Sequence, residues 1–178
     1  MINPIREYFK NFGKDRNTNE SPQNNIEGES NIKEMESSYS QIIKNQNADE
    51  VEDLMSEAYA NKNDDKTIDI IHQLIAEPWH RGYEEMAHYL QSCKRPESVP
   101  YLKNAMQKRY EYLESYGTGT RQFINQCGHA LWSIGTEEAI NSIRDLTVSD
   151  DPIIRDEMLY RISKIENRND YERNYDLE

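Results

Sequence analysis

Four histidines are the side chains of this chain whose chemistry best suits a metal site or acid–base catalysis. His72, His80 and His88 follow one another at intervals of eight residues, and on a helix each interval turns the side chain by about 80°. These three rings therefore cannot share one helical face. The sequence contains neither an H-E-x-x-H nor a C-x-x-C motif. We interpret these three and His129 as hydrogen-bonded core or groove residues, and we predict no metal site.

Paired carboxylates and a glycine-rich loop are the other features that could act in catalysis. Glu84–Glu85 and Glu137–Glu138 are expected to point to solvent, and the second pair falls in a first helical turn, where negative charge is favoured. The stretch YGTGTRQF lacks the spacing of a phosphate-binding loop and follows no strand, so we interpret it as a turn between helices. No Ser or Cys lies in a nucleophile motif. We therefore expect a protein that is not an enzyme, with no catalytic residue and no cofactor.

The charge of the chain restricts its partners. A formal net charge of −12 argues against binding to nucleic acid or to an anionic membrane, because both are polyanions. It suits a basic protein partner, although an acidic surface that serves solubility is the commoner explanation. No apolar run is long enough to span a bilayer, and MINPIREYFK lacks the apolar core of a signal peptide. Cys93 and Cys127 lie among apolar residues, so we predict reduced packing residues and a cytoplasmic location.

Composition divides the chain into a polar start and a helical remainder. Asn, Ser, Glu and Gly dominate residues 11–31, so the N-terminal segment 1–31 is predicted to be flexible and disordered. From residue 32 the apolar residues recur at helical spacing. NADEVEDLMSEAYAN places Val51, Leu54, Met55 and Ala58 on one face after an Asp49 N-cap. TIDIIHQLIAEPW predicts a second helix, which Thr67 caps and Pro78 ends.

An internal repeat follows these helices. Residues 88–106 align without a gap with residues 129–147, at an offset of 41. His88 falls on His129, and Leu90 on Leu131, so a structural role is favoured for both histidines. In each copy a helix ends at a polar turn, KRPE or GTEE, and a second helix begins. A period near 40 with two helices per unit is typical of HEAT or armadillo-like arrays, in which neighbouring pairs bury each other's apolar faces.

The stretch DPIIRDEMLYRISKI resembles the first helix of a HEAT-like repeat of the phycobilisome-lyase type, and GTEEAINSI resembles the turn and second helix of that family. Asp151 and Pro152 suit the start of a helix. The resemblance implies an all-α fold, a short α-α superhelix of HEAT-like helix pairs. The unit with a long, Tyr-rich second helix and the YGTGT loop departs from the family pattern. The expected organisation is a flexible segment 1–31, capping helices 32–66, repeats 67–165 and a polar tail 166–178.

A second resemblance concerns EPWHRGYEEMAHYLQ, residues 77–91. A Pro-Trp-His step that enters a helix is similar to a bacterial subset of small HEAT-like proteins, some of which resemble immunity proteins against toxins. It implies a protein-binding module, an immunity protein that neutralises a basic toxin, such as a nuclease, through an acidic surface. A HEAT-repeat scaffold or assembly chaperone is the alternative. A chromophore lyase remains a further one, whereas a DNA glycosylase would need a basic groove.

The partner surface is expected on the second helices, which in HEAT-like arrays line the concave face. Tyrosine is enriched in binding surfaces, and the chain has 12 Tyr against 3 Phe. Tyrosines on a helix that is packed on both sides would explain this content equally well. The residues predicted to bind the partner are Tyr110, Glu111, Glu114, Tyr116, Glu138 and Asp145.

Overall fold

The computed structural model describes residues 39–175 except positions 61, 63 and 116, with side chains described up to residue 167. All of them belong to one compact unit, Ile32–Glu178. The segment 1–31, predicted to be disordered, lies outside the described residues. Within them the chain is helical and has no strand, which confirms the all-α prediction. Residues 39–45 are helical, and the elements that follow are α3 (Glu50–Ala60), α4 (Asp65–Leu74), α5 (Tyr83–Cys93), η1 (Pro96–Ser98), α6 (Val99–Met106), α7 (Glu111–Ser115), α8 (Gly119–Ile134), α9 (Glu137–Leu146) and α10 (Pro152–Tyr175).

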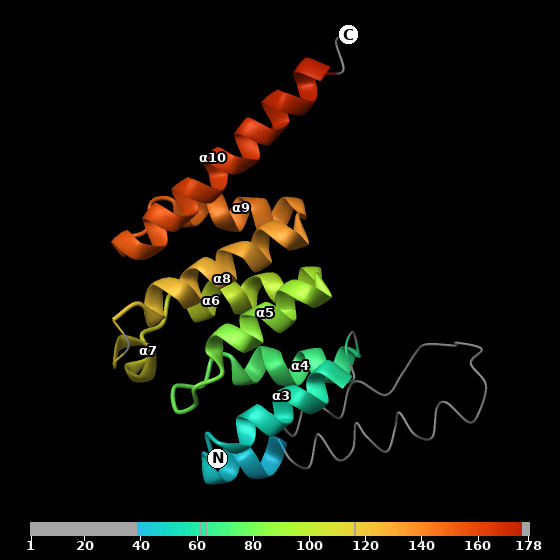
Figure 1. The fold of residues 1–178 in the computed structure, drawn as a ribbon, viewed down its shortest axis with the longest axis vertical. Coiled ribbons are helices and arrows are strands. Elements are labelled where there is room, and N and C mark those ends of the chain that lie inside the picture. Colours follow the sequence, from blue (N-terminus) through green and yellow to red (C-terminus); the bar gives the residue numbers. More distant parts are fainter. Residues whose placement is uncertain (1–38, 61, 63, 116, 176–178) are drawn as a thin grey trace, which may run out of the picture. The chain divides into compact units, whose positions relative to one another are not determined.

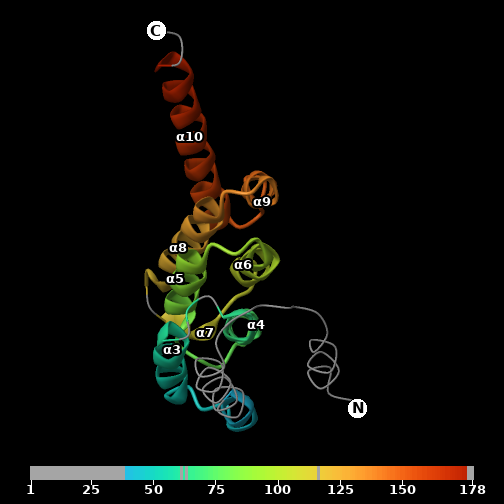
Figure 2. The same ribbon diagram turned by 90° about the vertical axis from the view of Figure 1, so that its right-hand side faces the viewer.

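The helices of this unit form two layers (Figures 1 and 2). The first helices of successive pairs, α3, α5, α8 and α10, stack in one layer, and the second helices, α4, α6 and α9, stack in the other. The helix α7 is inserted between α6 and α8 and packs on α8. A continuous core of buried Leu, Ile, Met and Tyr side chains lies between the layers. The predicted array of stacked helix pairs is therefore present.

The repeat at an offset of 41 is also a structural repeat. The pair α5–α6 and the pair α8–α9 each join their helices at a residue in the left-handed conformation, Lys94 (φ 53°) and Gly135 (φ 68°). The N–H of each donates to a carbonyl one turn back, that of Leu90 or Leu131, at 3.1 and 3.2 Å. These two caps are themselves 41 residues apart. Glycine suits this conformation, whereas a residue with a Cβ adopts it at a cost.

The helix α3 follows the prediction closely. Its apolar residues at positions 51, 54, 55 and 58 are buried, as the helical spacing indicated. Asp49 directly precedes the helix as expected, although its carboxylate lies 3.7 Å from Arg81. Leu131 of the internal repeat is fully buried, whereas Ile162, in the stretch DPIIRDEMLYRISKI, is half-buried. Cys93 and Cys127 are buried and unpaired.

Three predicted helix boundaries are wrong. The N-cap of α4 is Asp64, whose carboxylate accepts a hydrogen bond from the Thr67 N–H at 3.0 Å, so Thr67 lies inside the helix. Helix α4 ends at Leu74, well before Pro78. The long Tyr-rich second helix is two helices, α6 and the short α7. Helix α10 extends into the region 166–178, predicted to be a polar tail, as far as Tyr175.

Candidate partner-binding surface

The segment after α4, which includes the Pro-Trp-His step, is held by side chains from distant elements. The last carbonyls of a helix have no partner within the helix. Here four consecutive carbonyls, that of the last residue of α4 and those of the three residues after it, each accept a hydrogen bond from a side chain. The pairs are Leu74 O with His80 Nε2 (2.8 Å), Ile75 O with Tyr110 Oη (3.2 Å), Ala76 O with Lys108 Nζ (3.0 Å) and Glu77 O with Tyr83 Oη (2.8 Å).

His80 is a structural residue of this segment. Its Nδ1 accepts from the Gly82 N–H at 3.2 Å, so its Nε2 carries the proton that it donates to the Leu74 carbonyl. Burial lowers the pKa of His80 to about 4, although the hydrogen bond to Leu74 acts in the opposite direction. The ring is therefore neutral near pH 7. The predicted role of a hydrogen-bonded core histidine is confirmed.

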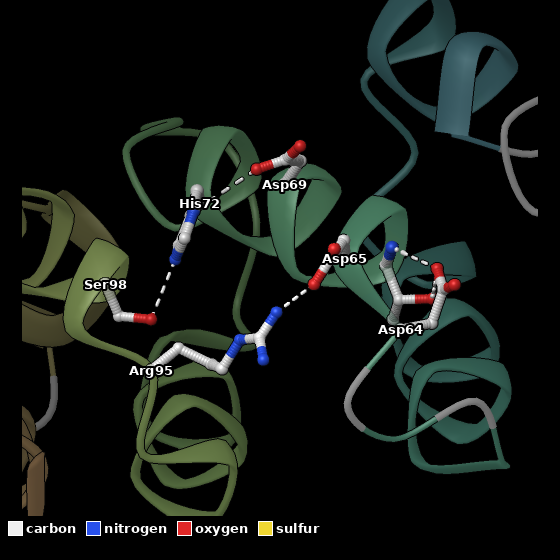
Figure 3. A network of polar contacts seen from close by, with 7 residues as sticks. Asp64, Asp65, Asp69, His72, Arg95 and Ser98 are labelled. Carbon is white, nitrogen blue, oxygen red and sulfur yellow. Dashed lines mark hydrogen bonds and ion pairs between the residues drawn. The ribbon is translucent and has the colours of Figure 1, made fainter. Parts of the chain in front are cut away.

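His72 lies in an arrangement that resembles a catalytic triad (Figure 3). Its Nε2 is 2.8 Å from the Ser98 Oγ, and its Nδ1 is 3.8 Å from the Asp69 carboxylate. No local sequence pattern predicts this arrangement, because Ser98 comes from the turn before α6, 26 residues further along the chain. A serine hydrogen-bonded to a histidine that a carboxylate orients is the geometry of nucleophilic catalysis.

Burial argues against a nucleophilic role for this group. Ser98 is 0% exposed and His72 is 1% exposed, so a substrate carbonyl cannot approach the hydroxyl. The Asp69 carboxylate is beyond hydrogen-bonding distance of the ring, and the His72 ring stacks on Tyr101 at 4.1 Å. Burial also lowers the pKa of His72 to about 4, which makes it a weak base at neutral pH. We interpret the contact as packing between α4 and α6, beside the Arg95–Asp65 ion pair in Figure 3.

The other two histidines lie between first helices. His88 is exposed and its Nδ1 is 3.4 Å from the Gln126 amide. His129 belongs to a polar cluster between α8 and α10, where its Nδ1 lies 3.1 Å from the Arg161 guanidinium. Arg161 is 4% exposed and pairs with Glu157 at 2.6 Å. The sequence does not indicate this buried ion pair, because an Arg in a polar helix is usually exposed.

The residues predicted to bind the partner do not form one surface. Tyr110 is a correction: it is 2% exposed, and its hydroxyl binds the end of α4, so it is a core residue. Tyr116 lies outside the described residues. Glu111 and Glu114 are exposed on the inserted helix α7, not on a second helix. The pair predicted on α9 is exposed there, namely Glu138 and Asp145.

Two of these four carboxylates are already paired within the chain. Asp145 accepts from Lys103 at 2.8 Å, and Glu114 lies 3.9 Å from Arg109. Basic side chains therefore balance part of the acidic charge on α7 and α9. The Asp145 carboxylate is mostly exposed, so its ion pair contributes little to stability.

A groove in the first-helix layer concentrates unpaired acidic charge. A hollow of about 640 Å³ lies between α3, α5, α7 and α8, and a second of about 350 Å³ adjoins it through Arg81 and Tyr112, which line both. We call the two hollows together the acidic groove. Its carboxylates make no ion pair with a basic side chain in the described part of the chain. They are Glu52 of α3, Glu84 and Glu85 of α5, and Glu111 of α7.

Arg81 is the basic residue among those lining the acidic groove. Its side chain is 59% exposed, 3.7 Å from the Asp49 carboxylate, and its guanidinium carbon lies 6.0 Å from the centre of the Tyr112 ring. The first distance is near the upper limit for an ion pair, and the second is at the upper limit for a cation–π contact. Trp79 lines the same groove, and its indole N–H donates to the Glu77 carboxylate at 3.0 Å. The groove thus combines carboxylates with two half-buried aromatic rings.

Comparison with known proteins gives no match, since no family model, no curated protein and no solved structure is similar to this chain. In the part of the chain that is described, no helix combines the length and apolar character of a membrane span. The same residues contain no group of His, Cys, Asp or Glu side chains arranged to hold a metal ion.

Proposed function

We propose that this chain is a non-catalytic protein-binding module and that its partner is a basic protein held at the acidic groove. The observation that carries the proposal is the set of exposed carboxylates without ion pairs that α3, α5 and α7 contribute to the two adjoining hollows of the acidic groove. Carboxylates opposite a cationic surface accelerate encounter and fix the register of binding. Aromatic residues at the same place supply the contacts that slow dissociation.

The partner that we propose is a bacterial toxin that the chain neutralises. Support comes from the resemblance of residues 77–91 to a subset of immunity-like HEAT proteins. In the structure this same stretch supplies Trp79, Arg81 and the Glu84–Glu85 pair to the acidic groove. A nuclease is the toxin class that fits best, because its substrate cleft must be basic to hold phosphates. An acidic surface that covers such a cleft would block substrate access.

A scaffold or assembly chaperone in the cytoplasm uses the same architecture with a different basic partner. It predicts the same binding surface but no toxicity of the captured protein. Expression of the captured protein in a bacterial host, with and without this chain, separates the two functions. Growth arrest that the chain relieves supports immunity, and normal growth in both cases supports the scaffold.

The binding proposal is tested by capture on the full chain followed by measurement with the purified partner. In one variant the four groove carboxylates, at positions 52, 84, 85 and 111, are changed to Gln. The control variant changes Glu137 and Glu138, which lie on α9 in the other layer, to Gln. We expect a basic partner whose association rate falls at least tenfold with the groove variant and little with the control. A partner of acidic charge, or equal binding to both variants, would refute the proposal.

A further inference from the structure

We infer that the acidic groove accepts an arginine side chain of the partner, and that Arg81 occupies this position in the partner-free chain. The inference rests on the proposed function, because it names the chemistry that the same groove would recognise. It also assigns Arg81 the role of an internal competitor, whose guanidinium must move aside when the partner binds.

The arrangement of carboxylates favours a cation with several donors. Glu52 and the Glu84–Glu85 pair line the larger hollow, and Glu111 lines the smaller one that adjoins it, so the carboxylates of the groove come from three helices. A guanidinium has five N–H donors in a planar fork, which matches two carboxylates at once, whereas an ammonium is a compact, strongly hydrated charge. A groove with carboxylates on three helices therefore favours the branched guanidinium of arginine over the single ammonium of lysine.

The aromatic residues of the groove favour the same cation. Trp79 and Tyr112 are half-buried, so each has one part fixed in the protein and another at the surface. The hydrogen bond from the Trp79 indole to Glu77 holds that ring in place before a partner arrives. A guanidinium stacks on aromatic faces through its planar π-system, and cation–π energy is larger for Trp than for Phe or Tyr. Preorganised rings of this kind lower the entropic cost of binding.

Arg81 shows that the groove already contains a guanidinium. The contact of Arg81 with Tyr112 spans 6.0 Å, and its distance to Asp49 is 3.7 Å, with the Asp49 side chain 87% exposed. Neither contact is strong, and the Arg81 side chain is more than half exposed. An arginine that is held this weakly can rotate into solvent at little cost. A partner arginine with shorter contacts to the unpaired carboxylates would displace it.

The direct test uses two synthetic peptides and the full chain. One fluorescent octapeptide alternates Arg with Gly, and the other alternates Lys with Gly, so that they carry equal charge. Fluorescence anisotropy at low ionic strength measures their dissociation constants. We expect the Arg peptide to bind at least fivefold more tightly than the Lys peptide. Equal affinity of the two peptides would overturn the inference, because it would show an acidic surface without preference for a guanidinium.

Variants locate the binding and test the role of Arg81. The double change Glu84→Gln with Glu85→Gln should weaken Arg-peptide binding about tenfold, whereas Glu137→Gln with Glu138→Gln, a matched pair in the first turn of α9, should change it less than twofold. Arg81→Ala should strengthen binding about three- to tenfold, beyond the effect of Arg144→Ala, which removes an equal charge from α9. Weaker binding by Arg81→Ala, or equal gains for both Arg variants, would show that Arg81 is no competitor.

The outcomes separate this inference from the proposed function. If a basic protein is captured but the two peptides bind equally, the groove binds a partner without arginine selection, and only the inference fails. If the Arg peptide binds at the groove but no basic protein does, the proposed function fails while the chemistry of the groove stands. Circular dichroism of each variant, with the spectrum of the unmodified chain as reference, tests whether the variant is folded.

Discussion

Acidification should destabilise this fold through two buried histidines. His72 and His80 are each 1% exposed, and burial lowers the pKa of each from 6.5 to about 4. Between these two pKa values the unfolded chain binds a proton at each histidine and the folded chain does not. The free energy of unfolding therefore rises with pH in this window. The stability is present in full above about pH 6.5 and is lost progressively down to about pH 4.

The size of the effect follows from the two pKa values. One pKa unit corresponds to about 1.4 kcal/mol, so the fall from 6.5 to about 4 amounts to about 3 kcal/mol for each histidine over the whole window. By about pH 5 roughly two-thirds of this stabilisation is lost at each histidine. For the two together we therefore expect the free energy of unfolding to be about 4 kcal/mol lower at about pH 5 than at about pH 7. Asp69 acts in the opposite sense, because burial and the charges of Asp64 and Glu97 raise its pKa.

Urea unfolding followed by circular dichroism, at constant ionic strength and several pH values between about 7 and 5, measures this dependence. His72→Gln and His80→Gln should each remove about half of the pH dependence, whatever their effect on stability at neutral pH. The exposed variant Asn141→Ala should retain all of it. A full pH dependence in both histidine variants would show that other groups cause the acid sensitivity, and it would refute our assignment of these rings as neutral buried residues.

Three further predictions concern single contacts. Tyr110→Phe should lower the free energy of unfolding by about 1–3 kcal/mol, because it leaves the Ile75 carbonyl without its donor, and it should leave partner binding unchanged. If urea unfolding showed unchanged stability and the variant lost binding, Tyr110 would instead be a residue of the binding surface. Arg161→Met should lower the free energy of unfolding by about 3–5 kcal/mol, since Glu157 then lacks its ion-pair partner. Adding Glu157→Gln to this variant should recover part of the loss in the same assay. Additive losses from the two changes would contradict a coupled pair. Lys94→Gly should raise the free energy of unfolding by about 1 kcal/mol and Gly135→Ala should lower it by about as much, because both positions have the left-handed conformation. Changes in melting temperature of the same sign for the two variants would contradict the shared cap geometry.

The sequence alone determined the helical class and the repeat. Apolar residues at helical spacing and polar turns are local signals, and they were sufficient to place α3 and to align α5–α6 with α8–α9. The turn at Gly135 could be recognised because glycine is the common left-handed cap. Its equivalent at Lys94 could be located only through the repeat, since lysine is not typical of that conformation.

The tertiary structure decided which polar residues are buried and where acidic charge is unpaired. Tyr110 and His80 are core residues because they bind carbonyls of α4, and Arg161 is buried because α8 supplies His129 and Glu157 is one turn away. These contacts join residues that are far apart in the chain or depend on the packing of a neighbouring helix, so no local pattern encodes them. The acidic groove has the same origin. Its carboxylates come from three separate helices, and adjacent Glu residues on any one of them look like an ordinary solvated face until packing brings the three together.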